Sequence, residues 1–310
     1  MPLCGMANHL LFDLQRHGCL SRVSSLRRRG HSGSSIEKAV RDGVVIRVAR
    51  DWIATPAASQ LAVVAVARGG KLTGASALAS YGIWDAVDRR IHIALRPNAH
   101  GTQIRIAVPI ARFTPPRFPP GQVKNHWNRE VAPVANEAPW RVSVIDALLI
   151  VESESPADQF VACIDSGIHT GGLSRAALPL LFSLLPVRAR AVLAHVDPSA
   201  ESGLESLARQ RLKGIARELE TQVTIPGIGK TGGSGRVDLL LDKWLVIELD
   251  GDEFHDPNAD RLRNAVLVRQ GFRIHRFGHE QTILDWPAVE ATVRELLRYP
   301  PSPPKSPGRI

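Results

Sequence analysis

The chain has 310 residues, of which 44% are apolar and 22% are charged. This length predicts two or three domains, and the composition excludes a chain that is disordered throughout, because it can bury a sizeable core. The 39 Lys and Arg outnumber the 30 Asp and Glu, and the net charge of +9 favours a polyanionic partner, although it can also serve solubility alone.

Cysteine content and hydropathy place the protein in a cellular compartment. Three cysteines without a C-x-x-C pair exclude a disulfide scaffold or a zinc knuckle and fit a reducing cytosol. No apolar run approaches the ~20 residues that span a bilayer, and the first residues lack the basic leader of a signal peptide. We therefore expect a cytoplasmic protein without membrane contact.

The sequence divides into three blocks and a tail, which together predict an α+β or mixed α/β fold. The blocks cover residues 1–56, 57–195 and 196–299. The tail, residues 300–310, is too rich in proline and too short to pack, so we expect it to be disordered.

The first block predicts a small helical unit that is closed by a hairpin. Apolar spacing indicates helices over residues 8–17 and 21–29, and a third helix starts at Ser34, where Ser-Ser-Ile-Glu reads as a capping box. Residues 44–55 alternate between apolar and polar side chains and reverse near Arg50, which indicates two short strands. This order is typical of a winged helix-turn-helix.

Basic side chains are concentrated in this block. Residues 1–55 contain nine Lys and Arg against four Asp and Glu. The third helix should expose Ser35, Lys38 and Arg41, and the other candidate DNA-binding residues are Arg27, Arg28, Arg29, Arg47 and Arg50. We predict that these groups contact DNA phosphates and place the third helix in the major groove. The alternative is a winged helix that contacts only protein and has a solvated basic face.

The middle block, residues 57–195, predicts a mainly helical scaffold. Two helices should flank Gly69-Gly70, IHIALR should form a strand, and TPPRFPPG should be a proline-rich connector. Further helices should lie between residues 143 and 185. Its histidines are scattered, and we interpret each as a surface or satisfied core residue: His92, His126, His169 and His195.

The third block predicts the order α-β-β-β-α-β-α, which begins with a helix over residues 201–219 and ends with one over 287–298, and it places acids inside its strands. Asp238 lies in one apolar strand, and Glu248 and Asp250 lie in the next, where alternation puts them on one face. A three-residue loop over 242–244 would pair residue 238 with 248, so that the three carboxylates converge. A two-residue loop would put Asp238 on the opposite face.

Converging carboxylates predict a site for a hard divalent cation. Like charges repel and burial of each ion is costly, and bound Mg²⁺ or Mn²⁺ would relieve both effects. Such an ion supports hydrolysis of a phosphodiester, and Glu205 on the preceding helix would complete the site. In the alternative, Asp238 caps a turn and the other two acids lie at an exposed strand end, in salt bridges with Arg261 or Arg263.

The order Glu205, Asp238, Glu248-x-Asp250 in this frame resembles the PD-(D/E)XK nuclease superfamily. The segments ESGLESLARQRL, GRVDLLL, VIELDGDEFH and RQGFRIHRF more narrowly resemble an uncharacterised bacterial domain family related to very-short-patch repair endonucleases. The resemblance implies a metal bound by Asp238, Glu248 and Asp250, a catalytic role for Glu205, and His255 as general acid or base. Asp250 stands where the superfamily usually has a lysine.

The first block resembles the winged helix of AbiEi-type antitoxins, and TGASALASYGIW and VSVIDALLI fit the segment that follows it there. This resemblance implies DNA binding or autoregulation in phage defence or a toxin–antitoxin system, and leaves a cognate toxin open as a second partner. The sequence thus predicts a DNA-binding protein with a Mg²⁺-dependent endonuclease-like domain. The alternative is a transcriptional regulator or antitoxin whose nuclease fold is inactive.

Overall fold

A computed structural model describes residues 3–85, 87–99, 121–127, 130–132, 138–229, 232–250 and 257–301. The chain is a mixed α/β protein with two compact units, Met1–Glu154 and Ser155–Ile310. The expected disordered tail, from residue 302 on, and the proline-rich connector up to residue 120 lie outside the described residues. Within the described ranges, none of the helices has the length and apolarity that crossing a bilayer requires.

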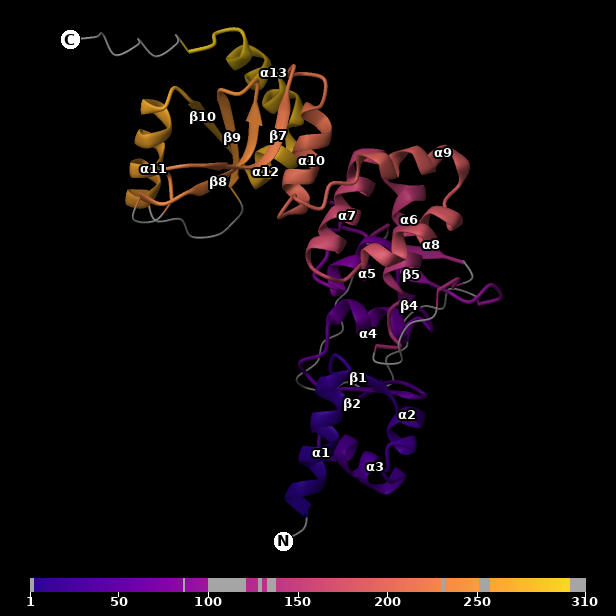
Figure 1. Ribbon diagram of the computed structural model, residues 1–310. Helices are drawn as coiled ribbons and strands as arrows, with labels where there is room; N and C mark the ends of the chain where they lie inside the picture. The colour runs from indigo at the N-terminus through magenta and orange to yellow at the C-terminus, as the bar shows by residue number, and fades with distance from the viewer. Residues whose placement is uncertain are drawn as a thin grey trace, which may run out of the picture. The chain divides into compact units, whose positions relative to one another are not determined.

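The first part of unit 1 packs three helices against a small antiparallel sheet (Figure 1). Its elements are α1 (Leu3–Arg16), β1 (Leu20–Arg22), α2 (Val23–Arg28), α3 (Gly33–Arg41), β2 (Ile46–Ala49) and β3 (Trp52–Ala54). The strand order is β1-β3-β2. The core includes one fully buried side chain from each of the three helices and one from β3: Leu14, Leu26, Ile36 and Ile53.

The first helix, the third helix and the hairpin are confirmed, and two details of this region differ from the prediction. The second helix begins at Val23, because the residues before it pair with β3 as strand β1, and the Asp51 carboxylate accepts hydrogen bonds from the Ser24 amide and hydroxyl. The predicted capping box at Ser34 is wrong. Ser32 is the N-cap and accepts from the Ser35 amide at 3.1 Å, while Glu37 pairs with Arg47.

The second part of unit 1 is less helical than its sequence predicts. It contains α4 (Gln60–Ala67), β4 (Lys71–Leu72), α5 (Gly74–Ser80), β5 (Ile91–Ala94), β6 (Val123–His126) and α6 (Val144–Glu154). The helices around Gly69-Gly70 and the strand at Ile91 are confirmed. The sheet order is β4-β5-β6, and its two outer strands were not predicted because they are short and contain a single β-branched residue, Val123.

Unit 2 joins a helical segment to a four-stranded sheet. The helical segment contains α7 (Ala157–His169), η1 (Arg175–Ala177), α8 (Leu178–Leu184), α9 (Val187–Arg190) and η2 (Ala191–His195). The sheet and its helices are α10 (Gly203–Leu212), β7 (Leu219–Ile225), β8 (Gly235–Leu241), β9 (Leu245–Asp250), α11 (Pro257–Arg269), β10 (Arg273–Gly278), α12 (His279–Leu284) and α13 (Trp286–Leu297). The predicted order of helices and strands is confirmed from α10 to β10, and after β10 one further helix, α12, precedes the final one.

The sheet of unit 2 is covered on both faces (Figure 1). Its strand order is β10-β9-β8-β7, with β10 parallel to β9 and the other pairs antiparallel. Leu267 of α11 packs with Val246 on one face. On the other face, Leu204 of α10 and Val293 of α13 pack with Ile247. The strand between them, β9, therefore has both faces in the core.

Two boundaries in unit 2 were predicted incorrectly. The helix expected over 201–219 ends at Leu212, since Gly214 has a φ of 87°, which ends the helical backbone, and β7 begins five residues later. The final helix is preceded by α12, and Asp285 separates the two, because its side chain accepts from the Ala288 amide and caps α13.

A buried carboxylate joins α7 to α10. Asp165 is fully buried and accepts hydrogen bonds from the Ser206 hydroxyl, from Arg209 at 2.8 Å and from the Asp197 amide at 2.8 Å. Burial raises the pKa of Asp165 to about 6, although these donors oppose the shift. The carboxylate thus fixes the helix that carries Glu205.

Candidate functional site

The β8–β9 hairpin has the register that a three-residue loop predicts. Leu241 pairs with Leu245 and Leu239 pairs with Ile247. The ladder stops there, one residue before the predicted pair of Asp238 with Glu248. Beyond that point the Asp238 carboxylate accepts a hydrogen bond from the Leu249 amide at 2.8 Å. The Asp238 side chain therefore lies in the opening between the two strands.

A local irregularity in the pairing of β7 with β8 accompanies the turn of the Asp238 side chain toward β9. Val237 packs on the face covered by α11, although Leu239, two residues later, packs on the opposite face. The β7 residue between the pairs that flank Asp238 is Gln222, and its φ of 52° is rare for a residue with a side chain. Asp238 is thus the residue at which the strict alternation of β8 fails.

Glu248 is buried beside two arginines. It is only 6% exposed, and its Oε1 lies 2.7 Å from an Nη atom of Arg263 on α11. Arg276 of β10 is its partner in the parallel register. Burial, followed by the negative charge of Asp238, raises the pKa of Glu248 to about 7, and the two arginines only partly oppose this shift. Glu248 therefore exchanges its proton near neutral pH.

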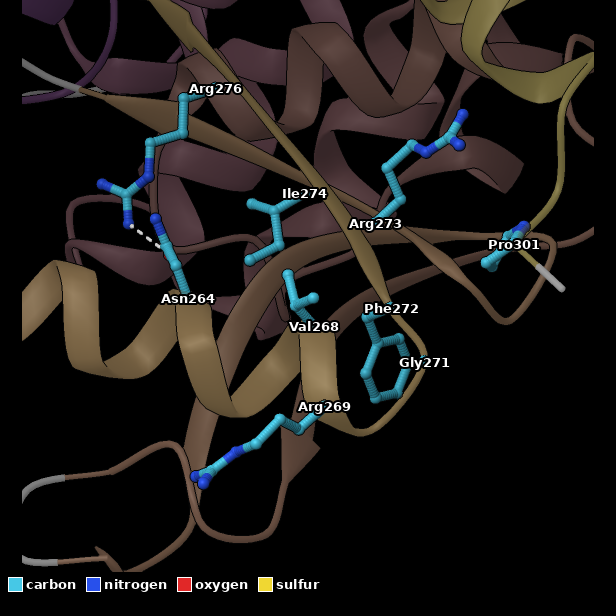
Figure 2. A pocket seen from close by; sticks show the side chains of 9 residues that line it. All are labelled: Asn264, Val268, Arg269, Gly271, Phe272, Arg273, Ile274, Arg276 and Pro301. Carbon is cyan, nitrogen blue, oxygen red and sulfur yellow. Dashed lines mark hydrogen bonds between the residues drawn. The ribbon is translucent and has the colours of Figure 1, made fainter. Parts of the chain in front are cut away.

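Two side chains of α11 hold Arg276 of β10 in place. Arg276 contacts Asp260 at 3.1 Å and bonds to the Asn264 side chain at 3.5 Å (Figure 2). Figure 2 shows Val268 of α11 facing Ile274 of β10 across a surface depression beside this bond. Arg263 of α11 and Arg276 of β10 therefore place two positive charges beside Glu248.

The alternative interpretation, in which the acids form salt bridges with arginines at an exposed strand end, is confirmed in one part and wrong in the other. Glu248 does pair with Arg263, but Glu248 is buried and does not lie at an exposed strand end. A buried carboxylate with a raised pKa is common where proton transfer or metal binding occurs, although structural ion pairs also produce such shifts.

Glu205 is linked to the position of Asp238 through one intervening residue, Gln222. It is buried on α10 and accepts hydrogen bonds from Gln222 Nε2 at 2.7 Å and from the Glu201 amide at 3.0 Å. Gln222 lies opposite Asp238 in the β7–β8 ribbon. Glu205 therefore positions the strand residue that faces Asp238.

Two predicted site residues have no described side chain. Strand β9 extends to Asp250, but the placement of the Asp250 side chain lies outside the described part of the structure, as does all of His255. The predicted convergence of three acids is thus described for Asp238 and Glu248 only.

The predicted DNA-binding residues of unit 1 lie mainly on its surface. Lys38 and Arg41 are exposed on α3, and Ser35 is half-buried, because its hydroxyl donates to the Ser32 carbonyl. Arg27 lies where a Cβ on Gly33 would be, beside the start of α3. The remaining arginines are exposed apart from Arg47, which is half-buried: Arg28, Arg29, Arg47 and Arg50.

Comparison with known proteins adds no family to this description. The chain matches no protein-family model, and no curated protein matches its sequence. The resemblances stated above therefore depend on the spaced motifs, and the function must be argued from the geometry of the acids and of the basic surface.

Buried histidines form a second polar cluster, in unit 1. His92 Nδ1 lies 3.0 Å from His126 Nε2, and His92 Nε2 lies 2.9 Å from Asp88. Both rings are buried, which confirms them as satisfied core histidines, whereas His169 and His195 are exposed. Burial lowers the pKa of His126 to about 4.

We expect unit 1 to lose stability as the pH falls from about 6.5 toward 4. In this window the unfolded chain binds a proton on His126, whereas the folded unit does not. The free energy of unfolding of unit 1 therefore falls by about 2 to 3 kcal/mol. Hydrogen exchange of unit 1 peptides at a series of pH values measures this loss. His126→Gln should flatten the profile, and His169→Gln, at an exposed position, should leave it unchanged. A His126→Gln profile as steep as the wild type's would assign the pH dependence elsewhere.

Proposed function

We propose that unit 2 is a metal-dependent nuclease-like domain that hydrolyses phosphodiester bonds. The observation that carries the proposal is the pair of carboxylates at the opening of the β8–β9 hairpin, where the charge of Asp238 helps to raise the pKa of buried Glu248. The resemblance to the PD-(D/E)XK superfamily points to the same residues.

The donor set suits a hard cation. Two neighbouring carboxylates supply oxygen ligands, and removal of the Glu248 proton would accompany binding. Asp238 and Glu248 would hold Mg²⁺ or Mn²⁺, which polarises a phosphoryl oxygen and lowers the pKa of a bound water. Arg263 and Arg276 would orient the phosphate by charge and offset the repulsion between the acids.

The test of this proposal is a nicking assay with supercoiled plasmid and Mg²⁺. The wild-type chain should nick the plasmid, and the double variant Asp238→Ala, Glu248→Ala should not. If the two proteins nick the plasmid equally well, Asp238 and Glu248 do not form the catalytic site.

We further propose that the first part of unit 1 is a winged helix that binds DNA through α3. Its topology supports this, because three helices precede a hairpin in a β1-β3-β2 sheet. Exposed Lys38 and Arg41 lie on α3, and Arg50 lies at the tip of the hairpin. These positions suit contacts with phosphates on both sides of a groove.

Removing Lys38 and Arg41 should weaken DNA binding and its dependence on salt. Each lost phosphate contact should reduce the slope of log K against log salt by about 1, so the double alanine variant should lose about 2. Fluorescence anisotropy with labelled duplex DNA measures this slope. Arg175→Ala with Arg217→Ala, two exposed arginines of unit 2, matches the loss of charge and should leave the slope unchanged. Equal slopes in both double variants would contradict a role for α3.

The second candidate function is that of a transcriptional regulator or antitoxin whose nuclease fold is inactive. Its partners would be DNA and a cognate toxin. The observation that favours it is the ion pair of Glu248 with Arg263, which already neutralises one metal-binding acid. It predicts specific operator binding that does not depend on metal, together with no nicking by the wild-type chain. Footprinting at the protein's own promoter, with and without Mg²⁺, separates it from the nuclease.

A further inference from the structure

Two histidines and an aspartate meet in unit 1, far along the sequence from the acidic site. His9 and Asp13 lie one helical turn apart on α1, and His31 lies in the turn before α3. Their ligand atoms all lie within 4.8 Å of one another, and within the described ranges no other group of three such residues does so. The sequence analysis missed this group because its members are separated by up to 22 positions and match no metal-binding spacing.

We propose that His9, Asp13 and His31 bind a borderline transition-metal ion of the Zn²⁺ class. Two imidazoles and one carboxylate are the donors that zinc, nickel and cobalt prefer, whereas Mg²⁺ and Ca²⁺ take oxygen ligands. Three protein ligands leave a fourth position for water. The site is distinct from the acids of unit 2 and does not depend on the function proposed for them.

The geometry needs only a small adjustment to accept the ion. His31 Nε2 lies 2.7 Å from Asp13 Oδ2, and the rings of His9 and His31 have centroids 5.0 Å apart. Ligands on a tetrahedral zinc ion lie about 3.3 Å apart, given Zn–N distances of about 2.0 Å. His9 is exposed and can approach the other two ligands by a rotamer change. His31 and Asp13 must move slightly apart, because their hydrogen-bonded atoms are closer than two ligands of one zinc ion.

Neighbouring charged residues influence the affinity of this site for a metal ion. Arg16 and Arg29 border the same depression, and their charge opposes a cation. Affinity must therefore come from direct ligation. Because His31 directly precedes Ser32, the N-cap of α3, a bound ion would fix α1 to the start of α3.

Titration of the full chain with Zn²⁺ tests the site. Chelator-treated protein is titrated against a chromophoric zinc indicator in buffer with excess Mg²⁺, which keeps hard-cation sites occupied. The wild-type chain should bind one equivalent that His9→Ala lacks or holds at least about tenfold more weakly. His9 is exposed, so this variant should fold, and a circular dichroism melt without metal should match the wild type's.

Three further variants of the chain test whether the bound Zn²⁺ belongs to the site of His9, Asp13 and His31. His9→Cys restores a zinc ligand and should restore the equivalent, and His169→Ala removes an exposed histidine of unit 2 without effect. The double variant Asp238→Ala, Glu248→Ala should also keep the equivalent, so loss of the proposed nuclease function leaves this result intact. If His9→Ala binds Zn²⁺ with the stoichiometry and affinity of the wild type, the proposal is overturned.

Discussion

Glu248→Gln should lower the rate of plasmid nicking at pH 8 by at least about 100-fold while leaving unit 2 as stable as the wild type or more stable. The amide keeps the shape of the side chain but cannot ligate a metal as an anion, and loss of such a group costs several kcal/mol in the transition state. Stability should not fall, because the raised pKa of about 7 means that folding disfavours the ionised form that the substitution removes.

The combination of lost activity and retained stability distinguishes a functional carboxylate from a structural one. Nicking rates and urea unfolding midpoints should be measured on the same preparations. Glu218→Gln, at an exposed position of unit 2, is the matched control and should change neither quantity. A Glu248→Gln protein that nicks at the wild-type rate, or that unfolds several kcal/mol more easily, would make the Glu248–Arg263 pair a structural salt bridge.

Asp165→Ala should destabilise unit 2 by about 3 to 5 kcal/mol, the cost of breaking a buried ion pair from one side. The substitution leaves Arg209, the Ser206 hydroxyl and the Asp197 amide without their shared acceptor. Urea unfolding measures the loss. Hydrogen exchange should locate it in α7 and α10, because the carboxylate joins these helices.

An exposed ion pair of the same unit provides the control. Glu295→Ala breaks the pair with Arg298 on α13 and should cost less than about 1 kcal/mol. Asp165→Asn keeps the size and one acceptor, so we expect a loss between those of the two alanine variants. If Asp165→Ala and Glu295→Ala lower the free energy of unfolding equally, Asp165 does not hold the helices together.

The sequence by itself determined the order of the elements from α10 to β10 and limited the β8–β9 hairpin to two registers. Both depend on short-range rules, because alternation fixes which residues face the core and loop length fixes which residues pair. Leu241 pairs with Leu245, which is the register of the three-residue loop and not that of the two-residue loop. Glycine positions carried less information. The sequence alone did not show that Gly214 ends α10, since glycine also occurs inside helices.

Only the tertiary structure decided what surrounds the acids. The Asp238 carboxylate bonds to the Leu249 amide at the point where the regular pairing of β7 with β8 is interrupted, and no local sequence pattern indicates this interruption. Arg263 reaches Glu248 because α11 packs on that face of the sheet. The same holds for His9, Asp13 and His31, which meet because α1 packs beside the turn before α3. Propensity and periodicity act over a few residues, whereas a binding site needs side chains from distant segments, and only the packing of the core brings these together.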